Sequence, residues 1–261
     1  MQASPARAID TVAAGGRNNY RSCSGASARV GLRFPHGCYG QFCPQAKAAE
    51  VLCQRWTLLV VRELIAGSRR FNELQRGLPQ ISPTLLTARL RQLESIDVVE
   101  RKREEGTSLY VLTKAGEELR GVIETMGVWG HRWVRSQLEK GDLDAGLLMW
   151  DMRRSVEPCH FTAVNVVVQF EFPDAGPGER YWWLVSNEHE TDLCLEDPGH
   201  EVDLLVRAPL QVMTSVWICE TTFSDAVRKG LIEVFGPARL REQLPHWLQS
   251  SALARLGQQV S

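Results

Sequence analysis

The most regular pattern of hydrophobic and polar positions in this chain lies in the segment Ile81–Glu94. Ser82 can cap a helix through its hydroxyl, and Pro83 fits the first helical position because it has no amide hydrogen. Leucines then recur at spacings of four and three residues, which predicts a buried stripe. The stripe consists of Leu86, Leu90 and Leu93. Another face carries two short polar side chains, Thr84 and Thr87, and one basic residue, Arg91.

Two shorter helices are predicted before this segment and a hairpin after it. Trp56–Ile65 is apolar enough for a core helix, which ends near Gly67, where a left-handed backbone is tolerated. Phe71–Leu78 fits a second helix, closed by a proline. Val98–Arg103 and Ser108–Leu112 are strand-like runs separated by four turn residues. Three helices followed by a hairpin predict a winged helix-turn-helix.

The polar side chains of this unit have the chemistry of DNA recognition. Short polar and basic side chains on an exposed helix can reach base edges and phosphates in a major groove. Basic residues on the first strand of the wing can hold phosphates beside that groove. The candidate DNA-contacting residues are Ser82, Thr84, Thr87, Arg89, Arg91, Arg101, Lys102 and Arg103. If the segment Ile81–Glu94 is considered without its neighbours, the alternative is an ordinary amphipathic helix with no role in DNA binding.

Several short motifs follow one another in order over about residues 43–133. They include Cys43-Pro44, Trp56-Thr-Leu-Leu59, Arg62-Glu-Leu64, Gly67–Leu74, Ile81–Leu90 and Val99-Glu-Arg101. Together they resemble the HxlR family of bacterial winged-helix transcription regulators. The resemblance implies a homodimer, a recognition helix at about Ser82–Ser95 and, in some members, a sensor thiol at the position of Cys43. Asp97 departs from the glycine that is frequent before the wing, but aspartate also tolerates that turn.

Cys43 has two interpretations. It precedes Pro44, so its sulfur can lie near a helix N-terminus, where the dipole lowers the pKa of a thiol and favours the reactive thiolate. The alternative is a small residue that packs or tethers a dimer. Cys53, between Leu52 and Gln54 in the first helix, which follows Cys43, is expected to be a core residue.

After the wing, Thr113 is a plausible cap for one long helix. Its apolar residues keep spacings of three and four over several turns: Leu119, Val122, Ile123, Met126, Trp129 and Trp133. This stripe needs a partner, either its own domain or the same helix of a second copy. We expect a homodimer formed through the first helix and the Leu119–Trp133 helix.

From about Gly146 the pattern changes to short strand-like runs separated by Pro, Gly and Asp turns. The runs Phe161–Phe172, Tyr181–Val185, Thr191–Leu195 and Val202–Val206 predict three or four antiparallel strands. Helices at Leu210–Ile218 and Thr222–Gly230, a short strand at Leu231–Phe235 and a closing helix at Pro237–Trp247 are predicted after them. The second half is therefore expected to be an α+β domain.

The runs Val202–Val206, Gly230–Gly236 and Leu244–Leu248, with the order of elements, resemble the sterol carrier protein type 2 fold over about residues 145–250. This resemblance implies a sheet and helices around an apolar tunnel for a lipid or another small hydrophobic molecule. Met213 and Trp217 are the candidate lining residues. The residues alone leave a filled core as the alternative, because the same Trp, Val, Leu and Met side chains serve both.

Composition divides the chain into parts. Residues 1–40, rich in Ala, Gly, Ser and Arg, are expected to be a disordered extension, residues 41–138 the DNA-binding domain and residues 145–250 a ligand-binding domain. The formal net charge is -1, yet residues 62–103 carry +4 and residues 142–261 carry -9. The positive potential is thus local to the predicted DNA-binding part.

Seven irregularly spaced cysteines support neither a disulfide framework nor a zinc site, and no apolar run is long enough to span a membrane. We therefore expect a soluble cytoplasmic protein without metal, cofactor or catalytic residues, which binds a double-stranded DNA operator as a transcription regulator. The first alternative is a hydrophobic-ligand carrier that uses the winged helix for protein contacts. The second is an enzyme built on His160 beside Cys159, or on His189, Glu190 and Asp192.

Overall fold

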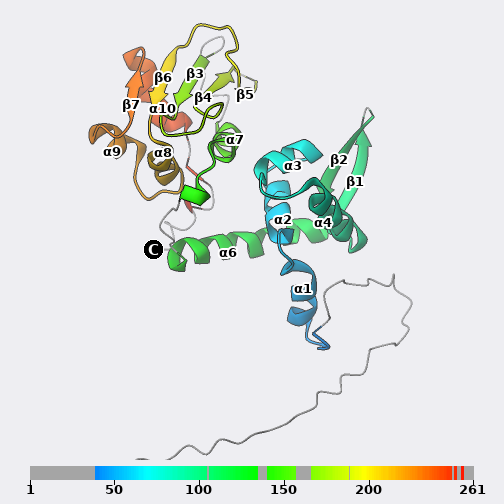
Figure 1. The fold of residues 1–261 in the computed structure, drawn as a ribbon. Helices are drawn as coiled ribbons and strands as arrows, with labels where there is room; N and C mark the ends of the chain where they lie inside the picture. Colours follow the sequence, from blue (N-terminus) through cyan, green and yellow to red (C-terminus); the bar gives the residue numbers. More distant parts are fainter. Residues whose placement is uncertain are drawn as a thin grey trace, which may run out of the picture. The chain divides into compact units, whose positions relative to one another are not determined.

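The computed structural model describes residues 39–104, 106–134, 140–156, 166–187, 189–248, 250–251 and 254–255 (Figure 1). The helices are α1 (Pro44–Leu52), α2 (Thr57–Ile65), α3 (Phe71–Gly77), α4 (Pro83–Ser95), α5 (Lys114–Glu118), α6 (Arg120–Trp133), the 3-10 turn η1 (Lys140–Asp142), α7 (Ala145–Ser155), α8 (Leu210–Trp217), α9 (Phe223–Arg228) and α10 (Ala238–Trp247). The strands are β1 (Val99–Glu104), β2 (Thr107–Leu112), β3 (Val166–Glu171), β4 (Tyr181–Ser186), β5 (Thr191–Cys194), β6 (Leu204–Arg207) and β7 (Glu233–Phe235). The fold is therefore a mixture of helices and sheet.

Helix α4 begins where its sequence predicts. The Ser82 hydroxyl accepts a hydrogen bond from the backbone N–H of Leu85 at 3.3 Å, and Pro83 is the first helical residue. The predicted stripe of Leu86, Leu90 and Leu93 is buried. It belongs to a hydrophobic core that also contains Val60, Val61 and Leu64 of α2, Leu74 of α3, and Val98, Val99 and Tyr110 of the hairpin region. This burial fixes which face of α4 points outward.

The hairpin forms as predicted but with a shorter turn. Strands β1 and β2 pair antiparallel from Val99 opposite Leu112 to Glu104 opposite Thr107. Two of the four expected turn residues, Glu104 and Thr107, are thus part of the ladder. The backbone N–H of Tyr110 also donates to the carbonyl of Arg69 at 2.8 Å, which attaches the hairpin to the start of α3. Asp97, just before β1, has φ 61, the conformation for which aspartate is tolerated.

The single long helix expected after the wing is two helices, so that prediction is wrong. Thr113 does cap α5, accepting from the N–H of Gly116 at 3.2 Å. The chain then tightens, because the N–H of Leu119 bonds to the carbonyl of Gly116, three residues back, instead of four. Helix α6 continues from Arg120 with the expected spacing of its apolar positions.

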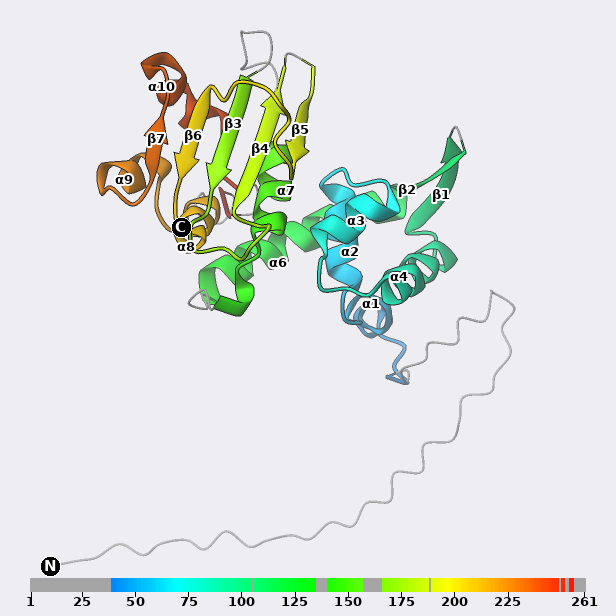
Figure 2. The ribbon, with the colours of Figure 1, turned by 45° about the horizontal axis from the view of Figure 1, so that its top comes forward.

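The second sheet has the strand order β5-β4-β3-β6-β7 (Figure 2). It is mixed and not purely antiparallel as expected, because β6 pairs with β3 in parallel, from Val168 opposite Leu204 to Glu171 opposite Arg207. Strand β5 also runs parallel to β3, since both are antiparallel to β4. The connection from β5 must therefore return along the sheet before β6 begins. The first half of the predicted strand Phe161–Phe172 lies outside the described residues.

Helices α7, α8 and α10 pack on one face of this sheet. Their buried side chains include Met149 and Met152 of α7, Met213 of α8, and Leu244 and Trp247 of α10. They meet Val168, Phe170, Leu184 and Val206 of the strands. Sequence interpretation placed no element between Gly146 and Phe161, yet α7 lies there, capped by the Asp144 carboxylate, which accepts from the N–H of Leu147 at 2.8 Å.

On the opposite face of the sheet, the Glu171 side chain is nearly buried between two arginines. Arg180 Nη2 donates to its Oε1 at 2.7 Å and Arg207 Nε donates to its Oε2 at 2.7 Å. These hydrogen bonds lower the pKa of Glu171 below its ordinary value of 4.5, and the hydrogen bond from Arg180 has the largest effect.

This lowered pKa predicts acid sensitivity. A carboxyl whose pKa is lower in the folded state stabilises the protein above its unfolded pKa, and that stabilisation is lost as the pH falls through the folded pKa. In thermal melts followed by circular dichroism, Glu171→Gln should lower the unfolding temperature at pH 7 and flatten its decline between about pH 5 and about pH 3. Glu196→Gln, at an exposed position, should keep the wild-type slope. A Glu171→Gln protein with that same slope would contradict the assignment.

Candidate DNA-binding interface

The outward face of α4 gathers most of the predicted base-reading residues. Ser82, Thr84 and Arg91 are exposed and Thr87 is half-buried. The Thr87 hydroxyl donates to the carbonyl of Pro83 at 2.9 Å, which leaves its oxygen lone pairs available as acceptors. Among the described residues Arg91 makes no ion pair. This face can therefore offer hydroxyl groups and one guanidinium to a base edge or a phosphate.

Arg89 is not grouped with these residues. Its Nε donates to the carbonyl of Arg55 at 2.9 Å and its Nη1 to the Oε1 of Gln92 at 3.3 Å. Burial lowers the pKa of the Arg89 guanidinium. In this structure the side chain joins α4 to the connection between α1 and α2.

The basic residues of the wing lie on both faces of β1. Arg101 and Arg103 alternate with Lys102, so the two arginines share one face and the lysine lies on the other. Arg101 Nη2 donates to the Ser108 hydroxyl at 2.8 Å, and its guanidinium carbon lies 5.9 Å from the centre of the Tyr110 ring. These contacts orient Arg101.

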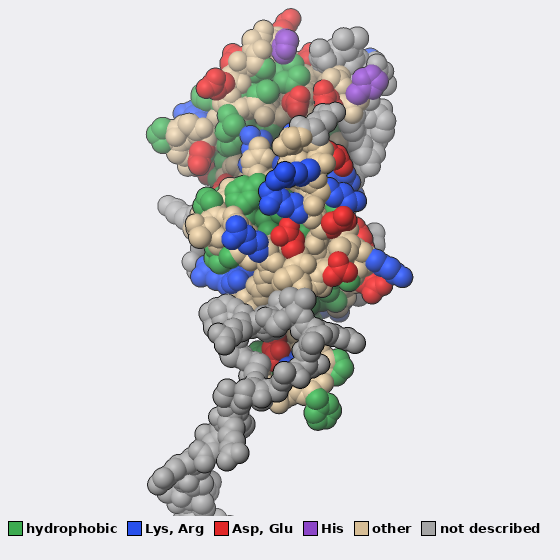
Figure 3. Space-filling view, turned by 90° about the vertical axis from the view of Figure 1, so that its right-hand side faces the viewer, with side chains coloured by type: hydrophobic (Ala, Val, Ile, Leu, Met, Phe, Trp, Pro, Cys, Tyr) green, Lys and Arg blue, Asp and Glu red, His purple; other side chains and the backbone are tan. Residues whose placement is uncertain are grey.

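Acidic residues accompany this basic cluster. Lys102 Nζ lies 3.6 Å from a carboxylate oxygen of Glu100, and both side chains are largely exposed. Such a surface pair is weak and can yield to a phosphate. Figure 3 views the molecule from the side on which β1 and β2 lie in Figure 1, and it shows lysine and arginine side chains gathered beside acidic ones.

Sequence interpretation missed the two residues that orient Arg101, namely Ser108 and Tyr110. Tyr110 lies directly opposite Arg101 in the ladder, and Ser108 is the next residue of β2 on the same face. The sequence held this register, because a four-residue turn also pairs Arg103 with Ser108 and therefore Arg101 with Tyr110.

Cys43 lies at the N-cap of α1 and is half-buried. The backbone N–H groups of Ala46 and, to a smaller extent, Gln45 lower the pKa of its thiol. The expected place at a helix N-terminus is confirmed. Cys53 is exposed and not in the core as expected, because α1 ends at Leu52 and Cys53 follows it.

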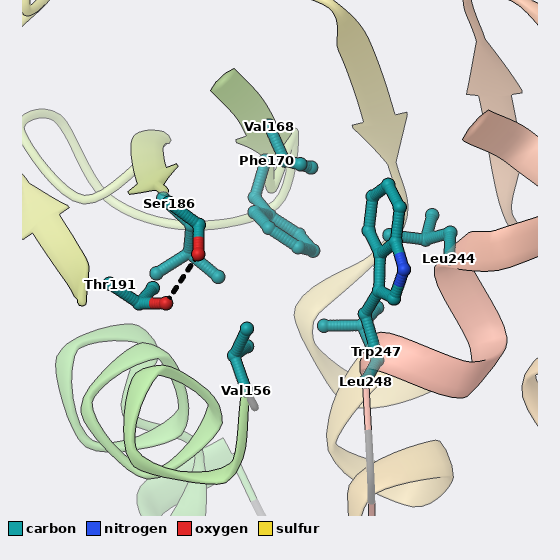
Figure 4. Close-up of a pocket in the computed structure, with 9 residues that line it drawn as sticks. Val156, Val168, Phe170, Ser186, Thr191, Leu244, Trp247 and Leu248 are labelled. Carbon is teal, nitrogen blue, oxygen red and sulfur yellow. Dashed lines mark hydrogen bonds between the residues drawn. The ribbon is translucent and has the colours of Figure 1, made fainter. Parts of the chain in front are cut away.

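A small apolar cavity lies in the C-terminal part between the sheet and α10 (Figure 4). It is lined by Val156, Val168, Phe170, Leu184, Ser186, Thr191, Leu244, Trp247 and Leu248. Its volume of about 10 Å³ is that needed by one water molecule. The Ser186 and Thr191 hydroxyls hydrogen-bond each other at 2.6 Å and form its polar edge.

The residues predicted to line a pocket do not line this cavity. Met213 is buried in the hydrophobic core, and Trp217 packs against that core while partly exposed. The large side chains of α8 therefore fill space here, which is the alternative that the sequence left open.

The described residues considered for catalysis lie at the surface around the start of β5. His189 and Glu190 are exposed in the turn before β5, where the Asn187 side chain accepts hydrogen bonds from both of their backbone N–H groups. Asp192 Oδ1 lies 3.7 Å from Nη2 of Arg153. His160 and Cys159 lie outside the described residues. In the described part of the chain no group of three His, Cys, Asp or Glu residues is arranged to hold a metal ion, and no described helix is both long and apolar enough to cross a membrane.

An α4 with its polar face outward, followed by a basic hairpin, defines a winged helix-turn-helix protein. Comparison with known proteins gives the family. Residues 51–138 match the model of the family described as HxlR-like helix-turn-helix. The uncharacterised HTH-type transcriptional regulator YvaP of Bacillus subtilis is 35% identical over 98 residues, which cover 36% of this chain and 91% of YvaP. This chain belongs to the HxlR family.

A second relative, the HTH-type transcriptional regulator YodB of Bacillus subtilis, is 34% identical over 104 residues, 38% of this chain and 89% of YodB. The solved structure of reduced YodB aligns at 31% identity with a TM-score of 0.33, over 36% of this chain and 97% of that chain. The names of these relatives support a DNA-binding transcription regulator. The comparisons do not support the resemblance to sterol carrier protein type 2.

The lowered pKa of Cys43 predicts a reactive thiol. At pH 7, iodoacetamide should alkylate Cys43 faster than Cys53, because the backbone N–H groups of Ala46 and Gln45 favour the thiolate form of Cys43. Mass spectrometry of peptides after timed quenching measures both rates in one sample. Cys53 is the control, since it is the more exposed of the two. Alkylation of Cys43 at or below the rate of Cys53 would contradict the prediction.

Proposed function

We propose that this protein is a sequence-specific transcription regulator that binds a DNA operator as a homodimer. The observation that carries the proposal is the outward polar face of α4 beside the basic strand β1. In this proposal Ser82, Thr84, Thr87 and Arg91 contact base edges and nearby phosphates, while Arg101, Lys102 and Arg103 hold the backbone. Arg89 would have to leave its contact with Arg55 to join them.

The apolar face of α6 supports the homodimer. Within this helix, Ile123 is buried, whereas Val122, Met126, Trp129 and Trp133 are 49–69% exposed. Four large apolar side chains along one helix form a patch that normally has a partner. A two-fold partner fits the symmetry of palindromic operators. Helix α1, which has no buried residue, is the second proposed dimer element.

Two control signals are proposed. Oxidation or electrophile attack at Cys43 is favoured by the lowered pKa of its thiol. The second control signal is a small hydrophobic effector, and the apolar lining of the cavity beside α10 supports it. Such an effector must enlarge the cavity, and it regulates only if it binds the DNA-competent and incompetent states unequally. Ligands that bind at saturation yet leave operator affinity unchanged would contradict this part.

A hydrophobic-ligand carrier with a protein-binding winged helix is the competing proposal, and it requires no selectivity for DNA. An enzymatic activity is a further alternative, for which the described candidates are the exposed residues His189, Glu190 and Asp192.

DNA recognition predicts different effects for helix and wing. In fluorescence anisotropy on duplexes tiled across the region upstream of its own gene, binding should be selective over scrambled duplexes and weaken steeply between about 50 and about 200 mM salt. Arg91→Ala should cost about 1–3 kcal/mol on the preferred duplex and relax selectivity, whereas Lys102→Ala should weaken binding to all duplexes.

Arg228→Ala, an exposed charge on α9, is the matched control and should bind as wild type does. Equal and weak binding to every duplex would contradict DNA recognition in that region and favour the competing proposal.

The dimer predicts that charge on α6 separates the subunits. Trp129→Glu combined with Trp133→Glu should convert a dimer to a monomer in sedimentation velocity, because two carboxylates would have to be buried without partners. Leu195→Glu, at a position 56% exposed in the C-terminal part, should remain dimeric. A monomeric wild type, or a double variant that stays dimeric, would overturn the α6 interface.

A further inference from the structure

Helix α7 has two buried sides. Leu148, Met149 and Met152 pack into the core of the C-terminal sheet. Trp150 is also buried, but it does not belong to that core, and the guanidinium carbon of Arg76 of α3 lies 5.5 Å from the centre of its ring. Helix α7 therefore contacts the helix-turn-helix and the sheet at once.

The contact continues to a buried carboxylate. Glu63 of α2 is completely buried, although the predicted core helix around it is apolar. Its Oε2 accepts from Arg154 Nη1 of α7 at 2.9 Å and from the Ser68 hydroxyl at 3.3 Å. Its Oε1 accepts from Arg62 Nη2 at 2.7 Å. A buried charge needs such partners, because losing one leaves it poorly compensated.

The space around this carboxylate is tight. A Cβ atom at Gly77 would lie 1.9 Å from the Glu63 Oε2, so only glycine fits at the end of α3. Arg62 Nη2 also donates to the carbonyl of Gly77 at 3.3 Å. The cluster thus reaches the end of α3 at Gly77, six residues before the first residue of α4.

Helix α7 also bonds to strand β5 of the C-terminal sheet. Arg153, the neighbour of Arg154, donates from Nε to the carbonyl of Thr191 in β5 at 2.8 Å. Thr191 also lines the cavity beside α10 and shares a hydrogen bond with Ser186 there. Two consecutive arginines of one helix therefore bond to the sheet and to the buried carboxylate of α2.

We infer that α7 couples the C-terminal sheet to the helix-turn-helix, with the Arg154–Glu63 ion pair as the latch. When α7 is docked, Arg154 completes the set of partners of Glu63 and holds α2 and the α3–α4 turn in the arrangement that presents α4. A change at β5 or in the cavity reaches this latch through Thr191 and Arg153. The effect on DNA binding rests on the proposed function, whereas the docking itself does not.

Two readouts on the full chain test the latch. Arg154→Met keeps an apolar stem and removes the charge. It should raise amide hydrogen exchange in peptides from α2 to the α3–α4 turn at least tenfold, and weaken binding to the preferred duplex at least tenfold at 25 °C. Arg228→Met, which removes an exposed arginine from an ion pair within α9, is the matched control and should change neither.

A second variant distinguishes loss of the Arg154–Glu63 ion pair from general destabilisation of the protein. Glu63→Gln with Arg154→Met removes both charges of this ion pair, while the Asp151 carboxylate, which Arg154 also binds, loses its partner in both variants alike. Exchange in α2 and α3 should therefore return toward wild type relative to Arg154→Met alone. Should Arg154→Met fail to fold, Arg154→Lys, which keeps the charge but cannot bond in two directions as arginine does, should give a smaller change in the same direction.

Wild-type exchange and affinity in Arg154→Met would overturn the latch, as would increased exchange with unchanged affinity, because the ion pair would then be structural only. If the wild type selects no duplex, the proposed function fails, and the exchange data alone still decide whether α7 holds α2.

Discussion

The orientation of α4 depends on the burial of its leucine stripe. Leu86, Leu90 and Leu93 are almost completely removed from solvent, and they share a core with residues of α2. Burying three leucines is worth several kcal/mol, about 1.5–3 for each side chain. A rotation of α4 about its axis would expose them. The polar residues on the other face are therefore kept outward, and the basic strand β1 follows directly in the chain.

Local structure was predictable where the sequence carries its own signals. Ser82 and Pro83 specify the start of α4, and Thr113 caps the helix after the wing as expected. The turn of the wing was predicted too long, because Glu104 and Thr107 are polar residues typical of both turns and exposed strand ends. The break at Leu119 has no proline to mark it, and the spacing of apolar residues continues across it.

Long-range features could not be predicted in the same way. Alternation identifies a strand but not the direction of its neighbour, so the parallel pairing of β6 with β3 was missed. Arg154 and Glu63 are 91 residues apart in sequence, and neither belongs to a motif that suggests the pairing. The candidate base-reading residues could be grouped from the sequence because they lie on one helix, and whether they contact DNA is part of the proposal. The residues that line the cavity come from separate strands and helices, and the candidates Met213 and Trp217 are not among them.

In the proposed function, two copies of α4 read one operator. Hydroxyl-radical footprinting on the duplex that the protein prefers tests it most directly. Two protected half-sites related by a two-fold axis are expected, with centres about 10 base pairs or a multiple of that apart, because successive major grooves on one side of DNA are one helical turn apart. A single protected half-site, or protection without a preferred position, would contradict it.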